Sequence, residues 1–195
     1  MKKKLILIVA AAMLVVAIGV GGTLAYLTAT STVTNTFTIG NVALTLDETD
    51  PATGEKTTTG VGYTNLVPTE VITKDPYVRV APGSQKCYLF AKLTETNAPA
   101  TYLDYTVLLD SASGWIPLGA DYPNIYYRVV DPLANPTPTL DFQLIKDDKI
   151  TVKEAVGGTI ALPTAVPEIK FTAYAVQFEN VANAEAAWAI LNPST

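Results

Sequence analysis

Hydrophobic and polar positions alternate along the segment from residue 33 to residue 46. Val33, Phe37 and Ile39 are apolar, and threonine occupies positions 34, 36 and 38 between them. A period of two predicts a strand with one face in a core. Gly40-Asn41 interrupts the pattern, and the apolar residues then occupy the even positions 42, 44 and 46. Because a slip of one residue turns every side chain to the opposite face, we expect a bulge or tight bend at this point.

Similar alternation predicts further strands, separated by turns rich in Gly, Pro, Asn and Asp. The expected strands cover residues 77–80, 87–93, 102–109, 124–130, 140–145, 149–155 and 168–178. Large residues on both sides of the segment 168–178 predict a central strand. Asn180 or Asn183 is expected to cap a helix over residues 184–191, which packs through Ala187, Trp188 and Leu191. Together these elements predict an antiparallel β-sandwich with one short C-terminal helix.

The first 25 residues have the pattern of an export signal. Lys2 to Lys4 are followed by an uninterrupted apolar run of 16 residues at 5–20. Small side chains at Thr23 and Ala25 place cleavage between Ala25 and Tyr26. The alternative is an uncleaved membrane anchor, but the run is short for a hydrocarbon core of about 30 Å. The expected organisation is therefore a signal peptide at 1–25, an N-terminal strand at 26–36 and a β-sandwich domain at 37–195, with membrane contact only before cleavage.

The charge balance argues against nucleic acid as a partner. The sequence has 13 Lys and Arg against 18 Asp and Glu, a net charge of −5. Removing the three lysines of the leader leaves 10 against 18, a net charge of −8. So acidic a chain cannot bind nucleic acid by neutralising its phosphates.

The chain has one cysteine and no histidine, which excludes several chemistries. No disulfide can form within the chain, no His-Glu-x-x-His zinc motif exists, and no catalytic triad with a histidine base is possible. Cys87 has no adjacent base to ionise its thiol, so we interpret it as a small buried strand residue instead of a nucleophile.

Two groups of acidic residues are candidate metal or catalytic sites. Asp47, Glu48 and Asp50 lack the spacing of a calcium-binding loop, and we interpret them as a solvated turn. Asp147 and Asp148 are adjacent, so their side chains point to opposite sides, and a plain turn is expected. The sequence therefore predicts no catalytic, metal or cofactor residues.

Three passages resemble one family of exported proteins. The sequence Ala-Tyr-Leu-Thr at 25–28, followed by Val-Thr-Asn-Thr-Phe-Thr-Ile-Gly-Asn-Val at 33–42 and Leu-Asp-Glu at 46–48, is similar to the start of TasA/camelysin proteins. Weaker similarity continues in the hairpin at 76–93 and in the segments 173–177 and 184–188. The resemblance implies export through a SipW-type signal peptidase of Gram-positive bacteria and a jelly-roll form of the sandwich. It also implies, for the TasA branch, an extracellular biofilm-matrix fibre subunit.

Three functions follow as hypotheses. In the first, the charge-poor segment from Tyr26 to Asn35, including Leu27 and Val33, adds as a strand to the sheet of the next copy and builds a homopolymeric fibre. Phe37 and Ile39 then hold its continuation in its own domain. In the second, the protein is a monomeric surface or adhesion module that binds through exposed Tyr122, Tyr126 and Tyr127. The third is a camelysin-like metallopeptidase, which without histidine needs an all-carboxylate site.

Overall fold

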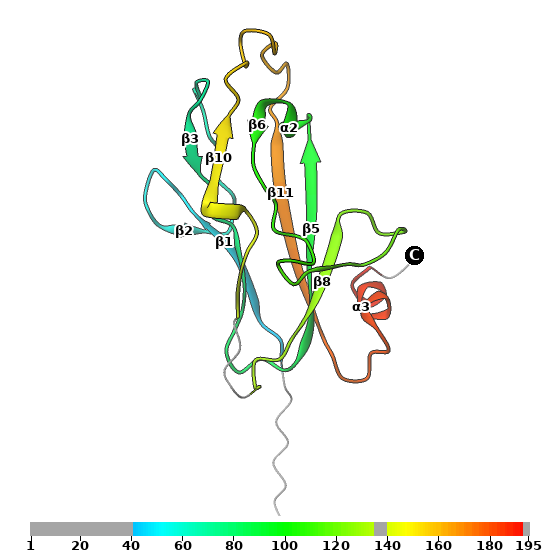
Figure 1. The fold of residues 1–195 in the computed structure, drawn as a ribbon. Helices are drawn as coiled ribbons and strands as arrows, with labels where there is room; N and C mark the ends of the chain where they lie inside the picture. Colours follow the sequence, from blue (N-terminus) through cyan, green and yellow to red (C-terminus); the bar gives the residue numbers. More distant parts are fainter. Residues whose placement is uncertain (1–40, 135–139, 193–195) are drawn as a thin grey trace, which may run out of the picture. The chain divides into compact units, whose positions relative to one another are not determined.

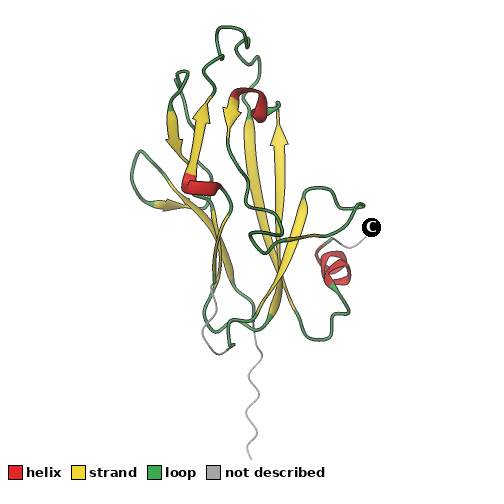
Figure 2. Cartoon of the chain, in the orientation of Figure 1, coloured by secondary structure: helices red, strands yellow, loops and turns green. Residues whose placement is uncertain are grey.

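A computed structural model describes residues 41–134 and 140–192, which form strands with a few short helices (Figures 1 and 2). The elements follow in the order β1 (Leu44–Thr49), β2 (Lys56–Thr57), β3 (Val71–Thr73), β4 (Tyr77–Val80), β5 (Cys87–Thr96), α2 (Pro99–Tyr102), β6 (Leu103–Asp104), β7 (Ile116–Pro117), β8 (Ile125–Val130), β9 (Asp141–Gln143), η1 (Lys146–Asp148), β10 (Lys149–Val152), β11 (Glu168–Gln177) and α3 (Ala184–Leu191).

The strands form three antiparallel sheets. Two have four strands, in the orders β2-β1-β4-β9 and β11-β5-β8-β7, and the third has the order β3-β10-β6. A backbone hydrogen bond from Lys74 N–H to the Asp148 carbonyl connects the segments leading from β3 to β4 and from β9 to β10. The small sheet therefore lies beside the first four-stranded sheet, and the predicted antiparallel β-sandwich is confirmed.

The larger core lies between the two four-stranded sheets. Apolar side chains meet there from β4, β5, β8 and β9 and from the connections around them. Its buried members are Val78, Val80, Cys87, Leu89, Ala91, Leu109, Trp115, Val130, Phe142 and Leu144. The expected inward direction of the even positions after Gly40 is confirmed, since Val42, Leu44 and Leu46 all pack against this core.

A second core lies on the opposite face of the β11-β5-β8-β7 sheet, beneath α3. Its buried members are Tyr88, Phe90, Leu118, Ile125, Val176, Ala184, Ala187 and Trp188. The Trp188 ring lies 5.3 Å from the Phe90 ring and 5.2 Å from the Tyr174 ring, measured between centroids. The predicted helix is confirmed, and Asn183 caps it by accepting a hydrogen bond from Ala186 N–H at 2.8 Å.

Two sequence expectations are wrong. Within the described residues, β11 is the end strand of its sheet and not a central one. The segment 102–109 is also not one continuous strand, because α2 occupies its start and β6 has only two residues. Asn97 and Ala98 adopt left-handed backbone angles just before Pro99, and this turn begins the short helix.

Within the part of the chain that the structure describes, no helix has both the length and the apolar character needed to cross a lipid bilayer.

Candidate assembly edge and charged network

β11 is hydrogen-bonded along one side over its whole length. Its ten residues pair with the ten residues of β5, and the described residues place no other strand beside it. Phe178 N–H donates to the Lys86 carbonyl just beyond the strand end. Because successive residues of an antiparallel strand point their backbone groups to opposite sides, the N–H and C=O groups of Phe171, Ala173 and Ala175 point away from β5. β11 therefore presents a row of backbone donors and acceptors to a further strand.

β1 has a similar open stretch near its start. Ala81 N–H donates to the Ala43 carbonyl at 2.9 Å, and β4 pairs with β1 from Leu44 to Asp47. The backbone groups of Leu44 and Leu46 therefore point away from β4. On that side β2 pairs with β1 only at Glu48 and Thr49. In the described chain, the edge of β1 before Glu48 thus has no paired strand.

β1 and β11 border different sheets but approach each other directly. Six half-buried apolar side chains on this border pack against the larger core, which is not fully closed here. They are Val42, Leu44, Leu46, Phe171, Ala173 and Ala175. We call the two facing edges of β1 and β11, with these six residues, the seam.

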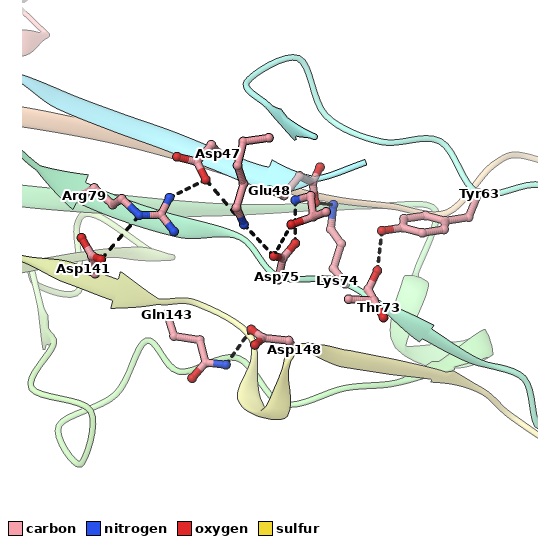
Figure 3. A network of polar contacts seen from close by, with 12 residues as sticks. Asp47, Glu48, Tyr63, Thr73, Lys74, Asp75, Arg79, Asp141, Gln143 and Asp148 are labelled. Carbon is pink, nitrogen blue, oxygen red and sulfur yellow. Dashed lines mark hydrogen bonds and ion pairs between the residues drawn. The ribbon is translucent and has the colours of Figure 1, made fainter. Parts of the chain in front are cut away.

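A network of charged side chains occupies the other part of β1 (Figure 3). Asp75 accepts hydrogen bonds from Thr49 N–H and the Thr49 hydroxyl, each at 2.7 Å, and from Lys56 Nζ at 2.8 Å. Burial by itself raises the pKa of Asp75, but the hydrogen bonds from Lys56 and Thr49 outweigh it and lower the pKa to about 2. This carboxylate therefore fastens the end of β1 to the segment before β4.

Two further ion pairs extend the network. Lys74 Nζ lies 2.5 Å from Glu48 Oε2, and both side chains are nearly buried. Arg79 donates to Asp47, lies 3.6 Å from Asp141, and has its pKa raised chiefly by the Asp47 hydrogen bond. Asp47 and Glu48 are thus partnered with cations, so their interpretation as a solvated turn is wrong.

A protein-family model matches the first part of the chain. Residues 1–79 match the family described as camelysin metallo-endopeptidase. The resemblance to the TasA/camelysin family is thereby confirmed over these residues. They include β1, β2, β3 and nearly all of β4, and all the network residues named above except Asp141. No curated protein and no solved structure matched the chain.

The description of the camelysin family implies a metal, so the network is the place to test for one. Zinc sites use thiolate, imidazole or carboxylate ligands whose lone pairs are free for the metal. Here Asp47, Glu48 and Asp75 already direct oxygens to Arg79, Lys74 and Lys56. Among the described residues, no three His, Cys, Asp or Glu side chains gather as a metal site. The network does not fit a metal ion.

The predicted cleavage and assembly residues lie outside the described residues. They are Ala25, Tyr26, Leu27, Val33, Phe37 and Ile39. Their roles therefore stay predictions. The structure supplies the edge on which such a segment can act, and this edge had no signal in the sequence.

Cys87 and the three tyrosines were the other candidate residues. Cys87 is fully buried, as predicted, and burial, followed by the charge of Asp131, raises the pKa of its thiol to about 11. Tyr122, Tyr126 and Tyr127 are half-buried and pack against the two cores. The expectation that these tyrosines form an exposed binding platform is wrong.

Proposed function

We propose that the protein is a secreted structural subunit of an extracellular fibre of the biofilm-matrix type. Its segment 26–36, released by cleavage after Ala25, adds as a strand to the open edge of β11 in another copy. The partners are a SipW-type signal peptidase during export and other copies of the chain afterwards. The observation that carries the proposal is the ten-residue edge of β11, hydrogen-bonded only to β5 among the described residues.

The charge pattern supports strand addition. Soluble proteins usually protect open edges with charged side chains, prolines or bulges. β11 has charges only at Glu168 and Lys170, and its other eight residues are uncharged. The segment 26–36 carries no charged residue either. Neither strand therefore repels the other or requires a charge to be buried on pairing.

Fibre assembly is testable by truncation. The chain that begins at Tyr26 is expected to form filaments visible by electron microscopy, whereas the chain that begins at Thr36 stays soluble because it lacks the donor strand. Trp115 is fully buried, so its blue-shifted fluorescence checks that each chain is folded. Filaments from both chains, or from neither, contradict the proposal.

A peptide experiment isolates the pairing step. A labelled peptide of residues 26–36 is expected to bind the chain that begins at Thr36 in a saturable manner, measured by fluorescence anisotropy. The matched control is the same peptide with Val33→Asp, which places a charge on the apolar side of the strand and should not bind. Equal binding of both peptides contradicts specific strand addition.

The camelysin description supplies a second candidate, a surface metallopeptidase. It predicts that the purified chain hydrolyses casein and that a chelator stops the hydrolysis. We propose that the protein is not an enzyme, because the carboxylates of the charged network are held in ion pairs. Chelator-sensitive hydrolysis by the purified chain contradicts this part of the proposal.

A further inference from the structure

The chain has two arginines, and they differ in their partners. Arg79 on β4 donates to Asp47 and lies 3.6 Å from Asp141, so two carboxylates balance its charge. Arg128 on β8 forms no ion pair with any described carboxylate. Outside the described residues the sequence contains no aspartate or glutamate. No acidic side chain of the chain therefore pairs with Arg128.

Arg128 lies between the two four-stranded sheets. Tyr126 and Val130 pack in the larger core, and because alternate residues of a strand share one face, Arg128 points to the same side. Its guanidinium carbon lies 3.9 Å from the centre of the Phe142 ring on β9 and 5.3 Å from the Trp115 ring. The guanidinium therefore lies at the border between β8 and β9, on the other side of the sheets from the seam.

The charge of Arg128 is only partly compensated by these surroundings. Burial lowers the pKa of Arg128, whereas the hydrogen bond to Asp47 raises the pKa of Arg79. An arginine nevertheless keeps its proton at neutral pH. The two rings attract the cation by about 0.5–2 kcal/mol through their faces. They offer no acceptor for the N–H groups, which point outward in the plane of the guanidinium.

One edge of the Arg128 guanidinium is open. Nη1 donates to the Ser113 carbonyl at 3.4 Å, whereas Nε and Nη2 have no acceptor among the described residues. No buried side-chain nitrogen of these residues lacks a partner, so Nε and Nη2 reach solvent. Gly114 lies beside Nη2, and a Cβ at this position would be only 3.0 Å away. Glycine therefore leaves room beside the two N–H groups that point in the same direction.

We infer that this edge of Arg128 binds a carboxylate supplied from outside the chain. Two parallel N–H groups match the two oxygens of a carboxylate, and such bidentate pairs are among the stronger hydrogen-bonded contacts. One guanidinium balances the single charge of a carboxylate, whereas a phosphate dianion needs further cations. The carboxylate comes either from a small organic acid or from an aspartate or glutamate of a second copy. The site does not depend on fibre formation.

Chemical modification tests the site, with Arg79 as an internal control. Phenylglyoxal reacts with accessible guanidinium groups, and mass spectrometry of peptides from the chain that begins at Tyr26 gives the rate at each arginine. In dilute protein we expect Arg128 to react faster than Arg79. Acetate should slow the reaction of Arg128 by about tenfold when its concentration exceeds its Kd about tenfold. Sodium chloride of equal ionic strength should not.

Protein concentration distinguishes the two sources of the carboxylate. If a second copy supplies it, Arg128 becomes protected as the protein is concentrated without acetate. If a small acid supplies it, the rate is the same at every protein concentration and only acetate protects. The inference is overturned if Arg128 reacts as slowly as Arg79 in dilute protein, or if acetate protects it no better than chloride.

A lysine variant separates binding from a purely structural role. Arg128→Lys keeps a charge beside the two rings but replaces the two-donor edge by a single ammonium group. Acetate is expected to raise the thermal unfolding midpoint of the parent chain and of Arg79→Lys, the matched control, but not that of Arg128→Lys. Equal rises in all three chains, or no rise in the parent, contradict a carboxylate site at Arg128. If Arg128→Lys does not fold, the modification of the parent chain decides.

Discussion

β5 and β11 are neighbouring strands of equal length with different surroundings. β5 is paired on both sides, with β11 and β8, and its residues from Cys87 to Ala91 are all buried. β11 is paired on one side within the described chain, and of its ten residues only Val176 is buried. Both sequences alternate and both carry large side chains toward both faces. The difference between them therefore comes from their place in the sheet and not from their composition.

This comparison shows where the domain can change partners. Rearranging β5 would break two ladders and open two cores. Adding a strand to β11 breaks no backbone hydrogen-bond ladder that the described residues form, and it would complete the burial of Phe171, Ala173 and Ala175. Three predictions test this contrast, beginning with the largest expected effect.

Truncating one phenylalanine in each strand compares their burial. Phe90→Ala removes a fully buried ring that contacts Trp188, so we expect a loss of about 3–5 kcal/mol in the free energy of unfolding. Phe171→Ala removes a half-buried ring, and we expect about 1–2 kcal/mol. Urea unfolding of both variants measures the difference. Equal losses of unfolding free energy would mean that Phe171 in β11 is buried as completely as Phe90 in β5.

Proline at adjacent positions compares the two sides of β11. Thr172→Pro removes an N–H that points toward β5, and we expect a loss of about 2–3 kcal/mol. Ala173→Pro removes an N–H that points away from β5, as edge strands tolerate, and we expect about 1 kcal/mol. The unfolding free energy is measured by urea titration, and binding of the 26–36 peptide by anisotropy.

The Ala173→Pro variant also tests whether the peptide binds at the outer edge of β11. Ala173→Pro is expected to remain folded but to lose peptide binding, because the donor strand needs the outward backbone groups of β11. Normal peptide binding by folded Ala173→Pro would exclude the outer edge of β11 as the acceptor.

The charged network at the end of β1 makes a smaller, pH-dependent contribution to the free energy of unfolding. The pKa of Asp75 is about 2 in the folded protein, below its ordinary value of 3.8. The ionised Asp75 carboxylate therefore stabilises the fold fully above about pH 4, and this stabilisation is lost as the pH falls toward 2. Asp75→Asn is expected to cost about 1–2 kcal/mol at pH 7 and progressively less below pH 4. Urea titrations across this range measure the cost, and a cost independent of pH would contradict the assignment.

The sequence predicted the features that depend on local order. Alternation located β5, the buried side chain of Cys87 and the inward side of β1. The helix α3 was also predicted, with Asn180 or Asn183 as its cap, and the structure shows that the cap is Asn183. Such patterns report which face a side chain occupies. They do not report which strand lies alongside, and for this reason β11 was wrongly predicted as central.

The ion pairs of the charged network could not be predicted from local sequence patterns either. Lys56 and Asp75 are 19 residues apart, Lys74 and Glu48 are 26 apart, and Arg79 and Asp47 are 32 apart. Only the register between β1 and β4 and the path of the chain around them bring these charges together. The family resemblance predicts export of the chain and cleavage near its N-terminus, but neither the seam nor the ion pairs follow from it.

The position of α3 has one more consequence. The helix shields one side of the β11-β5-β8-β7 sheet, and the opposing sheet shields the other. Lamination of such sheets, as in amyloid, is blocked on both sides, so any association through this sheet is restricted to a single dimension along its rim. A fibre made this way would keep each subunit folded and would lengthen without thickening through this sheet.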